Sequence, residues 1–326
     1  MDVRNDFPML KQDITYLDNC ATTFKPYSVI KEVSNYYENY CANSSRGDYD
    51  IGLKVDDKIK KVREKVKDFI NAKKSSEIIF TSGTTESLNI AIKGFFGDYL
   101  TKDDEVLTTK AEHASLILPW FNLSDKIGFN INYIDLGPDL TVLLENVKKA
   151  ITKNTKVISL AHVTNVFGDV RPIKEIIKLA HENNILVVID GAQSVPHKKI
   201  DVQDLDIDFL AFSAHKMMGP TGVGVLYGKE ELLDKIKPVL LGGGMNAFFD
   251  SNKNVTYKEL PEKLEAGTIN IAGIIGFGSA ISYINSIGIE KIEEHEINLK
   301  KYLVDKLSRV EYAFLNTDNL KSGDYR

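Results

Sequence analysis

Short apolar runs alternate with helix-periodic segments along most of the chain, and this alternation restricts the fold more than any other feature of the sequence. The runs are rich in β-branched residues and almost continuously apolar, which is typical of strands buried on both faces. The sequence therefore predicts an α/β fold with a mostly parallel central sheet and helices on both of its faces. The predicted strands comprise residues 77–82, 104–109, 129–136, 156–163, 185–190, 208–213 and 222–228.

Segments between these strands have the periodicity of amphipathic helices, at residues 84–96, 172–184 and 229–237. Residues 55–72 are the clearest example, because their apolar side chains fall on one stripe and lysines fall opposite. The stripe consists of Val55, Ile59, Val62, Val66, Phe69 and Ile70. We expect a helix on the surface of the protein here.

The pattern changes near residue 285, where a long, charged helical stretch begins and leads into one strand-like piece, EYAFLN (311–316). The sequence then ends in polar residues. We expect three parts on this basis. Residues 1–19 form an N-terminal segment associated with a small domain, residues 20–284 form a large domain, and residues 285–326 begin the small C-terminal domain, whose remainder is absent.

Composition excludes several classes of protein. The 326 residues are 43% apolar and 27% charged, which is ordinary for a globular protein. A formal net charge of −5 gives no basic surface, so nucleic acid is not an expected partner. Two cysteines indicate a reducing cytoplasm rather than a disulfide framework. Acidic residues near the N-terminus and the lack of about 18 consecutive apolar residues argue against secretion and a membrane.

Polar side chains cluster after five of the predicted strands, at residues 82–86, 112–115, 162–165, 190–193 and 213–216. In open α/β sheets the ligand site lies beyond the carboxyl ends of the strands. Each cluster alone has an ordinary structural explanation, such as a helix N-cap, a turn, or a lysine that extends toward water. Five clusters at the same edge of one sheet are better explained by a shared site.

Together the five clusters indicate pyridoxal phosphate (PLP). Hydroxyls and free helix N–H groups at residues 82–86 form an anion seat. Asp190 ends an apolar strand, where a carboxylate is costly unless it pairs with a cation such as a protonated pyridine nitrogen. Lys216 lies between apolar segments, where a lysine becomes a nucleophilic amine suited to a Schiff base. Metal ligation is a poor competitor, because the six histidines are scattered.

Seven motifs then identify a family: YLDNCATTFKP, TSGTTESLN, EHAS…PW, DGAQSVPH, FSAHKMMGPTGVGVLYGK, GGGM and EAGTIN. In this order, from Tyr16 to the end of the chain, they resemble the class V aminotransferases, most of all the SUF-type cysteine desulfurase and selenocysteine lyase branch. The resemblance implies the fold-type-I PLP architecture and a homodimer with sites at the subunit interface. It also implies removal of sulfur from L-cysteine, giving L-alanine and a persulfide that an acceptor protein uses for iron–sulfur cluster assembly.

The resemblance implies roles for individual residues as well. Lys216 matches the Schiff-base lysine, Asp190 matches the partner of the pyridine nitrogen, and His113 matches the imidazole that stacks on the ring and handles protons. The turn from Asp18 to Thr22 would edge the substrate pocket. The other matches are polar contacts: Gln193 and Asn165 near the ring hydroxyl, Thr84, Thr85, Ser213 and His215 around the phosphate, and Thr268 reaching the phosphate from the other subunit.

Two departures from the family pattern affect the substrate side. The persulfide-forming cysteine and the carboxylate-binding arginine of the family fall beyond residue 326, so we expect this chain to bind PLP but to release little sulfur. Ser45 and Tyr49 stand in a segment where relatives often carry histidines. We expect Cys20 and Cys41 to be small packed residues rather than nucleophiles, with Cys20 near the substrate.

Three alternatives to a cysteine desulfurase stay open from the sequence. Selenocysteine lyase or cysteine-sulfinate desulfinase activity needs no enzyme thiol. Another class V aminotransferase reaction would use the same PLP site. A PLP-fold module without turnover, acting as a dimeric interaction partner, would have the site but release no product.

Overall fold

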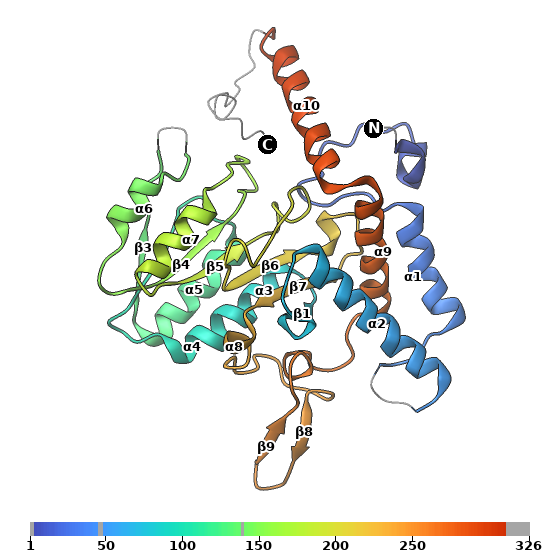
Figure 1. Ribbon diagram of the computed structural model, residues 1–326, viewed down its shortest axis with the longest axis horizontal. Helices are drawn as coiled ribbons and strands as arrows, with labels where there is room; N and C mark the ends of the chain where they lie inside the picture. Colours follow the sequence, from blue (N-terminus) through green and yellow to red (C-terminus); the bar gives the residue numbers. More distant parts are fainter. Residues whose placement is uncertain (1–2, 45–47, 138–139, 311–326) are drawn as a thin grey trace.

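A computed structural model describes residues 3–44, 48–137 and 140–310, and a seven-stranded sheet runs through its centre (Figure 1). The strand order is β1-β7-β6-β5-β4-β2-β3. Strands β2 to β6 pair in parallel, whereas β7 is antiparallel to both β6 and β1. All seven predicted strands are therefore confirmed, with the following bounds: β1 Ile78–Thr81, β2 Glu105–Thr108, β3 Asn130–Tyr133, β4 Thr155–Ala161, β5 Leu186–Asp190, β6 Phe209–Ser213 and β7 Gly224–Gly228.

Helices cover both faces of the sheet, which confirms the predicted α/β class (Figure 1). One apolar cluster joins the sheet to α1 (Tyr27–Asn39), α2 (Asp50–Phe69), α6 (Leu144–Ala150), α7 (Ile173–Glu182) and α9 (Ile271–Ile287). The second cluster joins the opposite face to α3 (Thr84–Asn89), α4 (Phe96–Tyr99), α5 (Ala114–Ile127) and α8 (Glu230–Leu233). Alternate strand residues divide between the clusters, as in β5, where Val187 and Ile189 face one layer and Val188 faces the other.

The predicted helix at residues 84–96 is present but not uniform. A π-helical segment, Ile90–Phe95, separates α3 from α4. Within it, a Cβ on Gly94 would lie 2.6 Å from the carbonyl oxygen of Lys237, and the Gly94 carbonyl accepts a 2.9 Å hydrogen bond from the Lys237 N–H. The π-helical segment therefore coincides with a close backbone contact, which periodicity alone does not reveal.

Helix α9 lies against α1 and α2 and is apolar all round (Figure 1). Its glycines allow the close approach, because a Cβ on Gly276 would lie 2.6 Å from Val33 of α1, and one on Gly278 would lie 2.5 Å from Val62 of α2. The predicted stripe of α2 is buried in this contact, apart from the half-buried Phe69.

Helix α10 (Ile289–Leu307) follows α9 after Gly288 and confirms the predicted charged helix. None of the described helices is by itself both long and apolar enough to cross a membrane. Helices α9 and α10 reach that length and composition only as a pair, and they are bent by 73° at their junction.

A two-stranded hairpin, β8 (Asn246–Phe249) and β9 (Val255–Tyr257), was not predicted and projects away from the sheet at the bottom of Figure 1. Its strands are four and three residues long, and their apolar side chains, such as Phe248 and Phe249, are exposed rather than packed in the core. The strand-like piece at residues 311–316 and the residue Ser45 lie outside the described residues.

Candidate active site

The carboxyl ends of the parallel strands meet at one edge of the sheet, and a pocket of about 380 Å³ opens there. Strand β1 is antiparallel to β7, which is antiparallel to β6, so β1 also ends at this edge. All five predicted clusters contribute to the pocket. It is lined by nine of the ten predicted cofactor contacts: Thr84, Thr85, His113, Asn165, Asp190, Gln193, Ser213, His215 and Lys216.

A pair of glycines brings the start of α3 to the end of β6. A Cβ on Gly224 would lie 2.4 Å from the Cα of Gly83, so the two backbones touch and leave no room for a side chain. The Ser213 Oγ then accepts a 2.7 Å hydrogen bond from the Thr84 N–H and lies 2.6 Å from the Thr84 hydroxyl. The side chains of Thr84 and Ser213 thus meet at the pocket, where their hydroxyls can donate to an anion.

Lys216 ends a 3₁₀ turn, Ala214–Lys216, that directly follows β6. The chain then folds back, and the Gly219 N–H donates a 2.9 Å hydrogen bond to the Ala214 carbonyl. Glycines follow at positions 219 and 222, yet the first residue of this turn with a left-handed backbone is Met218, at φ +63°. A methionine carries no sequence signal for that conformation, so this detail was missed.

The N-terminal segment holds the peptide group that precedes Lys216. The carbonyl oxygen of His215 accepts hydrogen bonds from the Thr23 N–H at 3.0 Å and from the hydroxyls of Thr22 and Thr23 at 3.2 and 3.1 Å. Lys25 adds a fourth donor to the same oxygen. Sequence reasoning expected the turn from Asp18 to Thr22 to edge the pocket, but it did not find this contact with the lysine turn.

Asp190 is the last residue of β5 and is only 5% exposed. Its Oδ1 accepts a 2.9 Å hydrogen bond from the Ala192 N–H. Burial raises the pKa of Asp190, although the Ala192 N–H and the Lys216 ammonium act in the opposite direction. In the described part of the chain, no basic side chain lies within ion-pair distance of this carboxylate. A cationic group bound in the pocket would therefore offset much of the cost of its burial.

Burial also changes the pKa of two basic groups of the pocket, Lys216 and His215. Burial lowers the pKa of Lys216, and the Asp190 carboxylate partly opposes this. Burial also lowers the pKa of His215, with Lys216 and Lys25 acting in the same direction. The pocket therefore favours an unprotonated amine and a neutral imidazole.

His113 is the N-cap of α5, and its ring contributes to the cap. The Nδ1 atom accepts a 3.1 Å hydrogen bond from the Ser115 N–H, so the neutral ring carries its proton on Nε2. The Ser115 hydroxyl in turn lies 2.7 Å from the Thr85 hydroxyl. The start of α5 is thereby linked to the start of α3 across the pocket.

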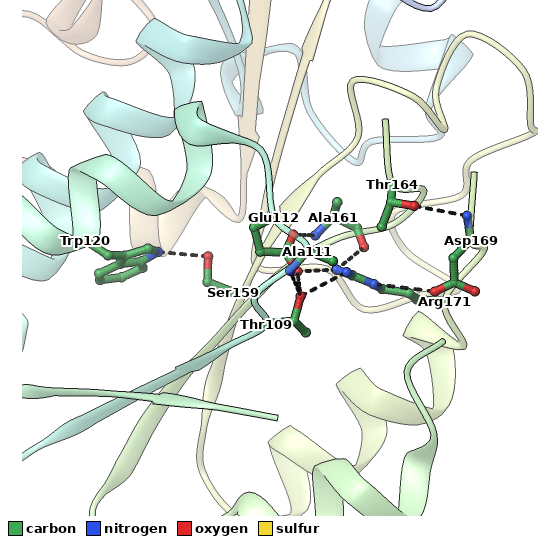
Figure 2. Close-up of polar contacts among 9 residues, drawn as sticks. All are labelled: Thr109, Ala111, Glu112, Trp120, Ser159, Ala161, Thr164, Asp169 and Arg171. Carbon is green, nitrogen blue, oxygen red and sulfur yellow. Dashed lines mark hydrogen bonds and ion pairs between the residues drawn. The ribbon is translucent and has the colours of Figure 1, made fainter. Parts of the chain in front are cut away.

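Figure 2 shows a buried ion pair between Arg171 and Glu112, the residue that precedes His113 in the chain. The side chains of Glu112 and Arg171 are 1% and 0% exposed, and the guanidinium contacts the carboxylate. Glu112 Oε2 also accepts a 2.8 Å hydrogen bond from the Ala161 N–H, and its Oε1 accepts one of 2.6 Å from the Thr109 hydroxyl. Arg171 was not among the predicted site residues, because nothing in its local sequence indicates a buried partner.

The two cysteines and Thr268 differ in their positions relative to the pocket. Cys20 lines it, and its carbonyl accepts a 2.9 Å hydrogen bond from the Gln193 side chain. The expectation that Cys20 and Cys41 are packed is wrong: both are exposed, because the first lies in a turn at the pocket and the second follows the end of α1. Thr268 is exposed and outside this pocket, and its hydroxyl contacts the Asn43 side chain at 3.3 Å.

Comparison with known proteins shows the family to which this chain belongs. The family model for class-V aminotransferases matches residues 15–322. A probable cysteine desulfurase of Halalkalibacterium halodurans is 43% identical over 95% of this chain and 77% of its own. The solved cysteine desulfurase of Thermococcus onnurineus NA1 superimposes with a TM-score of 0.93 at 38% identity, covering 98% of this chain and 79% of its own.

A further solved structure, SspA in complex with cysteine, has a TM-score of 0.73 at 31% identity over 83% of this chain and 73% of its own. The chain therefore belongs to the class-V aminotransferase family, in its cysteine desulfurase branch.

The chemical groups of the pocket fit pyridoxal phosphate. A half-buried amine with a lowered pKa suits an aldehyde, and a buried carboxylate without an ion-pair partner among the described residues suits a protonated ring nitrogen. The hydroxyls and N–H groups at the start of α3 suit a phosphate. Each part of the cofactor thus has a matching group at the same edge of the sheet.

Proposed function

We propose that this chain is a PLP-dependent cysteine desulfurase, which takes sulfur from L-cysteine and leaves L-alanine. One observation carries the proposal: Lys216 and Asp190 line the same pocket. Lys216 is half-buried there, and Asp190 is buried. This pair supports the cofactor, and kinship with cysteine desulfurases supports the reaction.

Lys216 is the residue that would bind the aldehyde carbon. Because burial lowers the pKa of its amine, a larger fraction is unprotonated and nucleophilic near neutral pH. As a free amine, Lys216 would also be the base that takes a proton from the substrate Cα and returns one to the product. The hydrogen bonds that Thr22, Thr23 and Lys25 donate to the His215 carbonyl restrict the backbone from which the Lys216 side chain extends.

Asp190 would keep a positive charge on the ring nitrogen. When bound, PLP supplies an electron-withdrawing ring that stabilises negative charge at the substrate Cα. His113, which lines the pocket, would lie against the ring, and the hydrogen bond from the Ser115 N–H to its Nδ1 fixes the orientation of the imidazole. Gln193 and Asn165 would contact the ring hydroxyl. The phosphate would be held by Thr84, Thr85, Ser213 and His215.

The finer parts of the proposal concern partners and location. A homodimer would allow Thr268, which is exposed and outside its own pocket, to reach the phosphate bound by the other subunit. The sulfur would pass as a persulfide to an acceptor protein for iron–sulfur cluster assembly. The cytoplasm is the proposed location, in keeping with two cysteines that are both free.

The test is to purify the chain with PLP and to add L-cysteine, L-selenocysteine or L-cysteine sulfinate in turn. We expect a visible cofactor band and a change of that band on addition of L-cysteine, with little L-alanine released by residues 1–326 alone. Lys216→Ala should lose the band, whereas Lys31→Met, on the exposed face of α1, should keep it. Alanine from selenocysteine or the sulfinate alone, with no response to L-cysteine, would refute the proposed substrate.

A further inference from the structure

The buried pair Glu112 and Arg171 (Figure 2) is connected to two parts of the pocket, at His113 and at Ala161. Glu112 is the residue before His113 in the chain. Both side chains also bind Ala161: the carboxylate accepts from its N–H at 2.8 Å, and the guanidinium donates to its carbonyl at 3.1 Å. Ala161 lines the pocket and is the strand partner of Asp190.

We propose that Glu112 and Arg171 are positioning residues for the cofactor pocket. They fix the backbone of His113 relative to the ends of β2 and β4, and their opposite charges cancel beside Asp190. This inference rests on the proposed function only for the identity of the ligand, because the geometry of the pair exists without it.

The positional part follows from the number of elements that the pair joins. Thr109, just after β2, donates its hydroxyl to Glu112 at 2.6 Å and accepts from the Arg171 Nη2 at 3.1 Å. The Arg171 N–H donates to the His162 carbonyl at 3.0 Å, which attaches the segment before α7 to the end of β4. Three segments distant in sequence therefore meet at one ion pair, and His113 has little freedom to shift along the edge of the sheet.

The electrostatic part concerns Asp190. Among the influences on the pKa of Asp190, burial raises it most, and the negative charge of Glu112 raises it further. The guanidinium of Arg171 contacts that negative charge directly. Without Arg171, an unpaired buried carboxylate would favour a proton on Asp190, and a neutral Asp190 holds a ring cation poorly.

The experiment compares Arg171→Gln, Glu112→Gln and the double variant Glu112→Gln/Arg171→Gln. Arg171→Gln leaves the buried Glu112 carboxylate without its cation, whereas in Glu112→Gln the guanidinium keeps the Asp169 carboxylate, 3.8 Å from its Nε. The double variant removes the charges of Glu112 and Arg171 together and leaves two neutral amides that retain hydrogen-bonding groups. Ser159→Ala is the matched control: it removes a buried hydrogen bond of 2.9 Å to Trp120 from the same strand, two residues before Ala161 (Figure 2). It therefore reports the effect of local destabilisation alone.

The first measurement is the dissociation constant of PLP for each apoprotein, from absorbance titrations. We expect Arg171→Gln to weaken binding about tenfold or more, and the double variant to stay within about threefold of the unsubstituted protein. Ser159→Ala should bind normally. Equal losses in Arg171→Gln and the double variant, or normal binding in both, would overturn the inference.

The second measurement needs no cofactor and separates this inference from the proposed function. In apoprotein labelled with ¹⁵N-histidine, the His113 ring should carry its proton on Nε2, because Nδ1 accepts from Ser115. Arg171→Gln should give a mixture of both tautomers at His113 and at no other histidine, and the double variant should restore the single form. An unchanged His113 signal in Arg171→Gln would contradict the inference. If the unsubstituted protein bound no PLP, the proposed function would fail. The His113 signal would still test whether Glu112 and Arg171 position that residue.

Discussion

The ammonium group of Lys25 donates a 3.1 Å hydrogen bond to the carbonyl oxygen of His215, the residue before Lys216. Lys25 also donates to the Thr23 carbonyl and, at 3.3 Å, to the Thr22 hydroxyl. Among the described residues no carboxylate pairs with it, so its positive charge is balanced only by dipoles. A charge that is held in this way is costly, and its cost depends on pH.

Lys25→Met is expected to remove a pH dependence from the stability of the fold. Burial lowers the pKa of Lys25 from 10.5 to about 8. Between these two values the unfolded chain binds more protons than the folded one, so stability rises as pH increases through this window. Urea unfolding across that range should show a smaller rise in Lys25→Met. The exposed lysine variant Lys31→Met should follow the unsubstituted protein, and parallel curves for all three proteins would contradict the prediction.

His181 should stabilise the fold in its protonated form. It contacts Asp206 at 2.9 Å and Asp208 at 3.0 Å, and the hydrogen bond with Asp208 raises its pKa above 6.5 although burial opposes this. Because the folded pKa is the higher one, this stabilisation is complete below the unfolded value and is lost as pH rises through the folded value. His181→Asn should therefore cost about 1 kcal/mol more at low than at high pH. Thermal unfolding on both sides of the window measures this, and a loss independent of pH would count against it.

Gly224→Ala should damage both stability and cofactor binding. The new Cβ would lie 2.4 to 2.7 Å from three backbone atoms of Gly83, so β7 and the start of α3 must separate. We expect a loss of about 1–3 kcal/mol in the free energy of unfolding and weaker PLP binding, because Thr84 moves away from Ser213. Gly97→Ala is the control, since its Cβ would meet its nearest neighbour at 3.9 Å within a helix. It should be neutral or slightly stabilising.

Arg63→Met should be among the most destabilising single changes. Arg63 and Glu265 form a bidentate pair of 2.7 and 2.9 Å, with side chains only 10% and 6% exposed. Loss of the guanidinium leaves a buried carboxylate, which costs about 3–5 kcal/mol. The double variant Arg63→Met/Glu265→Leu should recover part of that loss in denaturant unfolding. A double variant less stable than the single one would argue that packing rather than charge is decisive.

The sheet and most of the pocket were accessible from the sequence because each depends on local pattern. The strands are apolar runs, and two charged residues are conspicuous beside them: Asp190 ends one run, and Lys216 lies between two others. The π-helical segment Ile90–Phe95 and the left-handed Met218 were not accessible, since tertiary contacts determine both. The hairpin was also missed, because its strands are only four and three residues long and lie outside the alternation of strands and helices.

The contacts that support the pocket from outside were also missed. Lys25 binds the carbonyl of a residue 190 positions away, and Arg171 binds Glu112 across 59 positions. Neither basic residue lies in a motif that predicts burial, and carbonyl partners have no side-chain identity to detect. Their contacts form only in the folded protein, where the ends of the strands lie close together.

The reversed direction of β7 has a consequence for how such a protein can change over evolutionary time. The parallel strands are joined by long crossovers, where insertions can be absorbed by a helix or loop on the surface. The connection that carries Lys216 instead runs directly between the neighbouring strands β6 and β7, and both of its ends are fixed by sheet hydrogen bonds. Between β6 and Lys216 this connection is a 3₁₀ turn, so an inserted residue there would move the lysine relative to the end of the strand. Substrate preference can therefore drift through the crossovers while the anchoring lysine stays at one position in the fold.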